Sequence, residues 1–333
     1  MGGSSFLVFG AGSWGTALSL QLNRSNNKVF LSSFDQKNLS KIASTRENKK
    51  YLPGIILPNE VEVTGVTQEI LNKIGCVVIC VKSPYFLKSL SLIRNISKPI
   101  KVLWATKGFD SESGSLLSEV VSKQFGDAIE QGVLSGPTFA KELALNKPAA
   151  ITLATNTIKD PSSLASVMSN ESLRVYISND PIGVQLGGSL KNIIAIAAGI
   201  SDSMGMGANA RAALITRGAE EMRALGKEMG ANEKTFSGLS GIGDLVLTST
   251  DNQSRNRQLG LHIGEGGSLE SFREANNNSS PEGVHAVNAL VNAGMVNDDF
   301  YPITTRVYNI LFEDLSAKDA AAELMARPLR FEN

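Results

Sequence analysis

In the first half of the chain, short apolar runs rich in β-branched residues alternate with longer segments whose apolar residues recur at helical spacing. Alternation of this kind predicts an α/β domain built on a doubly wound sheet. Several of the runs are apolar throughout, which is typical of strands covered on both faces in a mostly parallel sheet. The predicted strands are residues 6–9, 29–32, 77–81, 102–105, 132–134, 151–154 and 174–177.

The pattern changes near residue 180. Extended runs give way to alanine-rich segments at helical spacing, most clearly residues 208–229 and 317–326. The Asn-rich stretch 276–281 predicts a loop. We therefore expect two domains, an α/β domain over residues 1–180 and an all-helical domain over residues 181–333, which the length of the chain allows.

Composition and charge exclude several classes of partner. Apolar residues make up 42% of the chain and charged residues 19%, as in soluble globular proteins. Lys plus Arg and Asp plus Glu number 32 each, so the formal net charge is zero and nothing favours a nucleic acid or an anionic membrane as partner. We find no apolar run with the length of a membrane span. Any anionic ligand must be bound by local groups.

The two cysteines, Cys76 and Cys80, fall in one predicted strand. Residues four apart on a strand are roughly 13 Å apart, which is too far for a disulfide. Buried thiols in a reducing compartment, together with an N-terminus that lacks the basic segment of a signal peptide, predict a cytoplasmic protein. The two histidines, His262 and His285, have no partner at metal-ligand or triad spacing, so we expect no metal site.

A glycine-rich segment, Gly10-Ala-Gly-Ser-Trp-Gly15, follows the first predicted strand and opens a predicted helix at residues 13–23. The spacing G-x-G-x-x-G is weak evidence alone, but between a strand and a helix it predicts a Rossmann-type dinucleotide site. Twenty-five residues after the first glycine, Asp35 either contacts a ribose or is a turn residue. No Arg lies between residues 31 and 36, which favours NAD(H) without excluding NADP(H).

Lys191 is the only charge in the apolar run 185–199. Partial loss of water lowers the pKa of such a lysine toward the range of a general acid or base, although its amine often reaches solvent instead. Lys107 follows the predicted strand 102–105. It either faces the crevice at the carboxyl ends of the strands, where doubly wound domains bind ligands, or is a solvated loop lysine.

A second polar segment spans residues 241–257. Within it, Arg255 and Asn256 are suitable donors for a phosphate, and Asp244 is suitable as a partner for a lysine. A solvated, salt-bridged loop would have a similar sequence.

The segment Ser-Gly-Pro-Thr-Phe, residues 135–139, ends another predicted strand. It either adds backbone N–H groups and the Thr138 hydroxyl to the ligand crevice at the carboxyl ends of the strands, or forms an ordinary turn.

Together these segments resemble the bacterial type of NAD(P)-dependent glycerol-3-phosphate dehydrogenases. The similarity covers nearly the whole chain in the family's order, and seven motifs in sequence are highly specific. The matching segments lie at residues 10–18, 104–108, 135–142, 183–192, 209–218, 243–248 and 251–257.

The resemblance implies reversible reduction of dihydroxyacetone phosphate to sn-glycerol 3-phosphate, a precursor of phospholipids, with NAD(H) or NADP(H), in a homodimer. It implies that Lys191 is the proton donor and acceptor. The implied substrate contacts, besides Lys191, are Lys107, Gly136, Thr138, Asp244, Ser254, Arg255 and Asn256. The implied cofactor contacts are Gly10, Gly12, Ser13, Trp14, Gly15, Phe34, Lys107, Ala140, Arg255 and Glu282.

The sequence departs from the family pattern at four places. Phe34 stands where many members carry Arg or His near the adenine ribose. Ser280-Pro281 replaces a pair of aliphatic residues before Glu282, Ser203 replaces a glycine, and Lys82-Ser-Pro84 replaces an aliphatic-Pro-Ser ending. Two other functions remain open from the sequence: a 3-hydroxyacid or 6-phosphogluconate dehydrogenase, and a module that senses NAD(H) without turnover.

Overall fold

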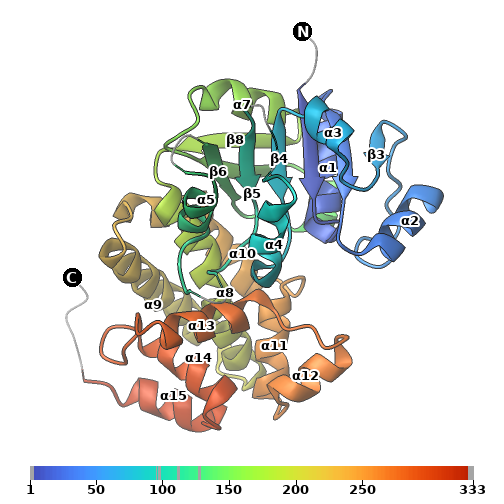
Figure 1. Cartoon of the computed structure of the whole chain (residues 1–333). Helices are drawn as coiled ribbons and strands as arrows, with labels where there is room; N and C mark the ends of the chain where they lie inside the picture. The colour runs from blue at the N-terminus through green and yellow to red at the C-terminus, as the bar shows by residue number, and fades with distance from the viewer. Residues whose placement is uncertain (1–3, 95, 97–98, 111–112, 127–128, 329–333) are drawn as a thin grey trace.

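The structure, a computed structural model, describes residues 4–94, 96, 99–110, 113–126 and 129–328. A sheet flanked by helices forms one part of the molecule, and a cluster of helices forms the other (Figure 1). Eight strands make up the sheet: β1 (Ser5–Phe9), β2 (Lys28–Ser32), β3 (Val61–Val63), β4 (Cys76–Ile79), β5 (Lys101–Trp104), β6 (Glu130–Ser135), β7 (Ala149–Ala154) and β8 (Leu173–Ser178).

The strand order is β3-β2-β1-β4-β5-β6-β7-β8. The first six strands are parallel and follow the doubly wound order, which reverses direction between β1 and β4. β7 runs antiparallel to β6, with Ser135 opposite Thr152, and β8 is parallel to β7. The prediction of a mostly parallel, Rossmann-type sheet is therefore confirmed, and all seven predicted strands are present.

The helices of the sheet part are α1 (Ser13–Arg24), α2 (Gln36–Thr45), α3 (Gln68–Lys73), α4 (Phe86–Ser91), α5 (Leu117–Phe125), α6 (Ala140–Ala144) and α7 (Pro161–Met168), with a short turn η1 (Ser83–Tyr85). Two apolar clusters cover the two faces of the sheet. Phe6 and Val8 of β1 belong to one cluster, and Leu7 belongs to the other, as the alternation of side chains along a strand requires.

The elements of the other part are α8 (Pro181–Ser203), α9 (Gly207–Glu228), η2 (Glu233–Ser237), η3 (Leu239–Gly243), α10 (Asp244–Thr250), α11 (Arg255–Gly264), α12 (Leu269–Ala275), α13 (Glu282–Asn292), α14 (Pro302–Phe312) and α15 (Ala317–Met325). The predicted helices at 208–229 and 317–326 correspond to α9 and α15 within one residue at each end. The predicted loop at 276–281 is also present, between α12 and α13.

Helix α8 is the centre of the helical part. It packs against α9, α10, α11 and α13 (Figure 1). Its contact with α11 is backbone to backbone: a Cβ atom at Gly199 would lie 2.3 Å from the carbonyl oxygen of Arg257, and one at Gly260 would lie 2.1 Å from that of Ile196. Any larger side chain at either glycine would force the two helices apart.

By length and composition, α8 alone among the helices of the described residues is apolar enough to cross a membrane, so our expectation of no such run was wrong. Its most apolar window has a mean hydropathy of 1.2, and 89% of that window is buried inside the protein. Helix α8 is therefore a core helix, because its apolar side chains are already covered by other helices.

The junction between the two parts is short. β8 ends at Ser178, and Asp180 caps the N-terminus of α8 by accepting a hydrogen bond from the N–H of Gly183 at 2.9 Å. The other carboxylate oxygen of Asp180 accepts from the N–H of Asn232 at 3.0 Å and from the Thr235 hydroxyl at 2.6 Å. One carboxylate thus fixes the start of α8 to the η2 segment.

Candidate active site

The glycine-rich loop connects β1 to α1 at the point where the strand order reverses. Gly10 has a φ of +121°, and a Cβ atom there would lie 2.5 Å from the carbonyl oxygen of Cys80. A Cβ atom at Gly15 would lie 2.0 Å from the carbonyl oxygen of Gly10. These two glycines are required by the packing of the protein itself.

Gly12 differs from its neighbours. A Cβ atom at Gly12 would contact no protein atom within 4 Å, and no side chain caps the first turn of α1. Backbone N–H groups at a helix N-terminus with open space before them fit a pyrophosphate, which is the group that this loop binds in dinucleotide enzymes. The geometry of the loop therefore fits NAD(H) or NADP(H).

At the end of β2, Asp35 is a helix cap. Its carboxylate accepts the N–H of Asn38 at 3.0 Å and pairs with Lys50 at 3.0 Å, and these two contacts hold its pKa below the usual range. Of the two interpretations for Asp35, the structure favours the turn residue. Phe34 packs its ring edge-on against Phe9, with a centroid distance of 4.8 Å, and the Nζ of Lys88 lies 4.9 Å from the Phe34 ring.

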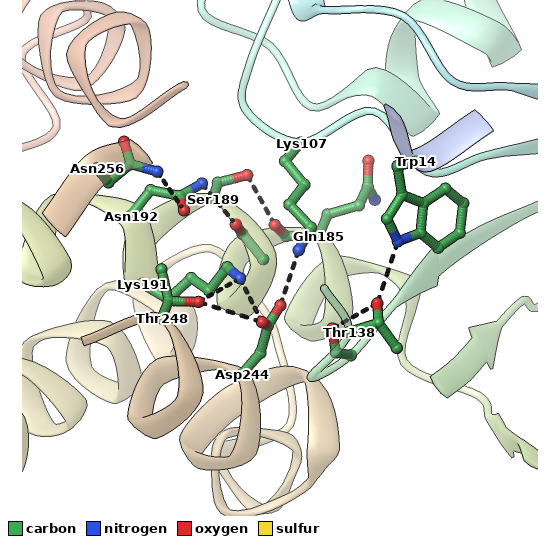
Figure 2. Close-up of polar contacts among 12 residues, drawn as sticks. Trp14, Lys107, Thr138, Gln185, Ser189, Lys191, Asn192, Asp244, Thr248 and Asn256 are labelled. Carbon is green, nitrogen blue, oxygen red and sulfur yellow. Dashed lines mark hydrogen bonds and ion pairs between the residues drawn. The ribbon is translucent and has the colours of Figure 1, made fainter. Parts of the chain in front are cut away.

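Lys191 and Lys107 meet at one buried carboxylate (Figure 2). Lys107 donates to Oδ2 of Asp244 at 2.8 Å, and Lys191 contacts Oδ1 of the same residue. Lys191 also donates to the hydroxyl of Thr248 at 2.7 Å. The exposed fractions of these side chains are 6% for Lys191, 2% for Asp244 and 20% for Lys107, so all three groups are largely removed from water.

A single carboxylate cannot neutralise two buried ammonium groups. Burial, and after it the charge of Lys107, lower the pKa of Lys191, while Asp244 raises it; together these effects lower the pKa to about 7. Burial also disfavours the charged form of Lys107, but Asp244 and Glu282 outweigh it and the pKa of Lys107 is raised. The lysine pair keeps the pKa of Asp244 low despite its burial. Lys191 is therefore the group that gains and loses a proton near neutral pH.

Local backbone features position these groups. Asp244 begins α10 directly after η3, in which Gly241 has non-helical dihedrals (φ −96°, ψ −107°). A Cβ atom at Gly187 of α8 would lie 2.3 Å from the carbonyl oxygen of Ser240, so this segment lies directly on α8. Lys107 comes from the loop after β5, where the N–H of Gly108 donates to the Ser189 hydroxyl of α8 at 2.8 Å.

The loop after β6 lies against the glycine-rich loop. The indole N–H of Trp14 donates to the Thr138 hydroxyl at 3.1 Å, and that hydroxyl contacts the carbonyl oxygen of Gly136 at 3.4 Å (Figure 2). Gly136 has a φ of +152°, and a Cβ atom there would lie 2.9 Å from the Cα of Ile151. Helix α6 begins at Ala140, directly after this loop.

Asn256 connects three helices. Its amide nitrogen donates to Asn192 of α8 at 2.8 Å, and its amide oxygen accepts the N–H of Gly283 of α13 at 2.8 Å.

Ser254 caps α11 by accepting the N–H of Arg257 at 3.2 Å. Arg255 is exposed and donates to the backbone oxygen and the hydroxyl of Ser279, each at 3.1 Å. Glu282 is the first residue of α13. Its charge raises the pKa of both Lys107 and Lys82, whereas burial lowers the pKa of both lysines.

The structure thus brings Lys191, Lys107 and Asp244 into direct contact, while Phe34 lies at the end of β2. Several polar contacts were not predicted from the sequence. Thr248 lies four residues after Asp244 on one helix face, a spacing that could have identified it. Ser189 and Ser279 carry no comparable signal, because their partners are distant in the sequence.

A dinucleotide loop at the topological switch point, facing a buried lysine from a helical second part, defines the class of nicotinamide-dependent dehydrogenases with an appended helical region. The family models for the N-terminus and the C-terminus of NAD-dependent glycerol-3-phosphate dehydrogenase match residues 5–160 and 180–322, so the chain belongs to this family. Membership confirms the resemblance seen in the sequence, and with it the expected class, an oxidoreductase that uses NAD(H) or NADP(H).

Curated relatives are similar over their full length. The chain is 42% identical to a glycerol-3-phosphate dehydrogenase [NAD(P)+] of Pseudoalteromonas translucida (strain TAC 125), covering 99% of this chain and 98% of that protein. It is 43% identical to that of Thioalkalivibrio sulfidiphilus (strain HL-EbGR7), covering 96% of each. The crystal structure of glycerol-3-phosphate dehydrogenase from Coxiella burnetii matches with a TM-score of 0.92 at 37% identity, covering 98% of this chain and all of that one.

Proposed function

We propose that the chain catalyses reversible hydride transfer between NAD(P)H and dihydroxyacetone phosphate, giving sn-glycerol 3-phosphate for glycerophospholipid synthesis. The observation that carries this proposal is the pair of lysines on one buried carboxylate, in which Lys191 has a pKa of about 7. A group that titrates near neutral pH serves equally as acid in one direction and as base in the other.

When bound, the reduced nicotinamide supplies the hydride to the carbonyl carbon. Negative charge then develops on the carbonyl oxygen, and Lys191 in its ammonium form donates a proton to that oxygen. Lys107, whose raised pKa keeps it charged, stabilises the developing charge without giving up its proton. In the reverse direction the neutral amine of Lys191 removes the hydroxyl proton. Asp244 and Thr248 hold the amine in place in both directions.

The remaining site residues are proposed as binding groups. Arg255 and Asn256 would bind the substrate phosphate, and their position at the N-terminus of α11, after the Ser254 cap, favours an anion. Besides Lys107 and Asp244, we propose Gly136, Thr138 and Ser254 as further substrate contacts. We propose Gly10, Gly12, Ser13, Trp14, Gly15, Phe34, Lys107, Ala140, Arg255 and Glu282 as cofactor contacts.

We also propose a division into a dinucleotide-binding domain, residues 1–180, and a helical domain for substrate and catalysis, residues 181–333. The end of β8 at Ser178 and the start of α8 at Pro181 support this boundary. A cytoplasmic location and a homodimer are proposed as well. The location is supported by two free cysteines, Cys76 buried in β4 and Cys80 half-buried directly after it, and the homodimer by family resemblance.

A nicotinamide absorbance assay tests the proposal. Purified protein with dihydroxyacetone phosphate should oxidise NADH or NADPH, and parallel runs with the two cofactors measure the preference. A 3-oxoacid and 6-phosphogluconate with the matching cofactor form serve as comparison substrates. Turnover only with these substrates would indicate a different dehydrogenase, and cofactor binding without turnover of any substrate would indicate a sensor.

A further inference from the structure

Lys82, in one segment that departs from the family pattern, contacts Ser279, which directly precedes another such segment, Ser280-Pro281. Lys82 follows the carboxyl end of β4, a central strand, beside the glycine-rich loop, where Gly10 packs on Cys80. Its Nζ donates to the hydroxyl of Ser279, in the loop between α12 and α13 of the helical part. Lys82 therefore connects the sheet part to the helical part.

Arg255 contacts the same serine. Its Nη2 donates to the hydroxyl and to the backbone oxygen of Ser279, each at 3.1 Å. A hydroxyl oxygen has two lone pairs, so Lys82 and Arg255 together occupy both. Two cations therefore converge on one neutral oxygen.

Among the ion pairs of the described residues none includes Lys82 or Arg255, and Glu282 is the acidic group that acts on Lys82. Lys82 is about half buried, and this burial, followed by the charge of Arg255, lowers its pKa, while Glu282 acts in the opposite direction. The arrangement has unfavourable like-charge repulsion that a bound anion would relieve. The Ser279 hydroxyl is a weak partner that an anion with several acceptor oxygens can replace.

We propose that Lys82 and Arg255, which meet at Ser279 from the two parts of the molecule, form a two-cation phosphate-binding pair, which makes Lys82 a specificity-determining residue of this chain. The ligand class is a phosphate group, either the phosphate of the substrate or the pyrophosphate of the dinucleotide. This proposal rests on the proposed function for its substrate. It goes beyond that function because the resemblance implies Arg255 as a ligand contact but places no cation at position 82.

The test compares Lys82→Met and Lys82→Arg with the wild-type enzyme. Steady-state kinetics give kcat and the KM of each substrate, and fluorescence titration gives the Kd of NADH. Lys82→Met should weaken one phosphate ligand about tenfold or more, since one charge-assisted hydrogen bond is lost, with kcat within about twofold of wild type. Lys82→Arg should restore most of the affinity. A rise in the KM of dihydroxyacetone phosphate assigns the pair to the substrate, and a rise in the KM and Kd of the cofactor assigns it to the pyrophosphate.

Two control variants separate anion binding from other roles. Lys73→Met removes a lysine from the exposed surface of α3 and should match wild type. Ser279→Ala removes the bridging hydroxyl, so it should leave ligand affinity unchanged or increase it. If Ser279→Ala reproduces the loss seen in Lys82→Met, Lys82 only holds the two parts together, and the proposal is wrong. Unchanged affinities in Lys82→Met overturn it as well.

The proposed function and this inference fail in different ways. If wild-type protein does not turn over dihydroxyacetone phosphate, the proposed function fails. Binding of inorganic phosphate and of NADH, measured by calorimetry on wild type and on Lys82→Met, then still tests the pair. Equal binding of both probes by the two proteins would rule out a role of Lys82 in anion binding.

Discussion

Lys191 and Lys107 contact opposite oxygens of the Asp244 carboxylate, one from the core of the helical part and one from the end of a strand. The three groups carry one excess positive charge when both lysines are protonated. Because Lys191 is the more buried lysine, it is the one that releases a proton, and the chemistry proposed for the site follows from this difference.

Replacement of Lys191 by alanine should lower kcat by about 10²–10⁴-fold, the range expected for loss of a general acid. The Kd of NADH should stay within about twofold, because the glycine-rich loop lies between β1 and α1 and Lys191 lies on α8. Rapid kinetics and fluorescence titration measure the two quantities. Lys227→Ala, on the exposed surface of α9, is the matched control. Near-normal turnover by the Lys191 variant would contradict its assignment as proton donor.

The two directions of the reaction should show opposite pH dependence. Ketone reduction requires the ammonium form of Lys191, so kcat/KM should fall as pH rises through about 7. Alcohol oxidation requires the neutral amine, so kcat/KM should rise over the same interval. Profiles in both directions between pH 5.5 and pH 9, an interval of roughly two units around the pKa, measure this. Parallel profiles in the two directions would exclude Lys191 as the titrating group.

Substitution of Lys107 by methionine should move the same midpoint upward. The like charge of Lys107 lowers the pKa of Lys191, and its removal leaves Lys191 alone with Asp244. The residual reduction activity of Lys107→Met should therefore persist to higher pH than in wild type. A midpoint that does not move, or that moves to lower pH, would show that the two lysines are not coupled.

Two glycines of the same loop should respond differently to alanine. In Gly12→Ala the new methyl group contacts no protein atom, so stability should fall by at most about 1 kcal/mol while the Kd of NADH rises at least about tenfold. In Gly15→Ala the methyl group overlaps the backbone of Gly10, and stability should fall by about 1–3 kcal/mol. Thermal unfolding and cofactor titration distinguish the two. Equal loss of stability in both variants would contradict the open position of Gly12.

Glu221 should make the stability of the protein depend on pH. It accepts hydrogen bonds from the N–H groups of Ile303 and Thr304, at 2.6 and 3.0 Å, and from the Thr304 hydroxyl, yet burial raises its pKa to about 7. The folded state therefore binds the proton more tightly than the unfolded state. Its contribution is fully present below pH 4.5 and is lost as pH rises to about 7, by at most about 3 kcal/mol.

Urea unfolding of wild type and of Glu221→Gln over this pH interval measures the effect. The wild-type free energy of unfolding should have an additional downward slope with pH that the glutamine variant lacks. The difference between the two proteins is the informative quantity, since other groups titrate in both. An identical slope in the two proteins would contradict the raised pKa.

Most of the fold could be predicted from the sequence, because the spacing of apolar residues reflects which side chains are buried. Both faces of the central strands are covered, and their apolar runs identified seven of the eight strands. β3, with three residues, was missed because it is too short to show a period. The antiparallel pairing of β7 was also missed, since the pattern of a strand does not record its direction.

The candidate site was predictable only in part. Lys191 was detectable because a charge in an apolar run is rare, and Asp244 was named as a possible lysine partner. That both lysines share this one carboxylate depends on the approach of two segments 137 residues apart, which no local pattern encodes. The contact between Lys82 and Ser279 has the same origin. Helix α8 is a different case: its apolar run 185–199 is visible in the sequence, but not that the helix extends from Pro181 to Ser203.

The position of Lys191 on α8 also determines how the site responds to fluctuations. Helix α8 is the most enclosed helix of its part, so its amide hydrogens are accessible to exchange with solvent only when that part opens as a unit. The loop that carries Ser279 lies between α12 and α13, outside the helices, and has no helical hydrogen-bond ladder. We therefore expect the amide hydrogens around Lys191 to exchange more slowly than those of the loop that carries Ser279.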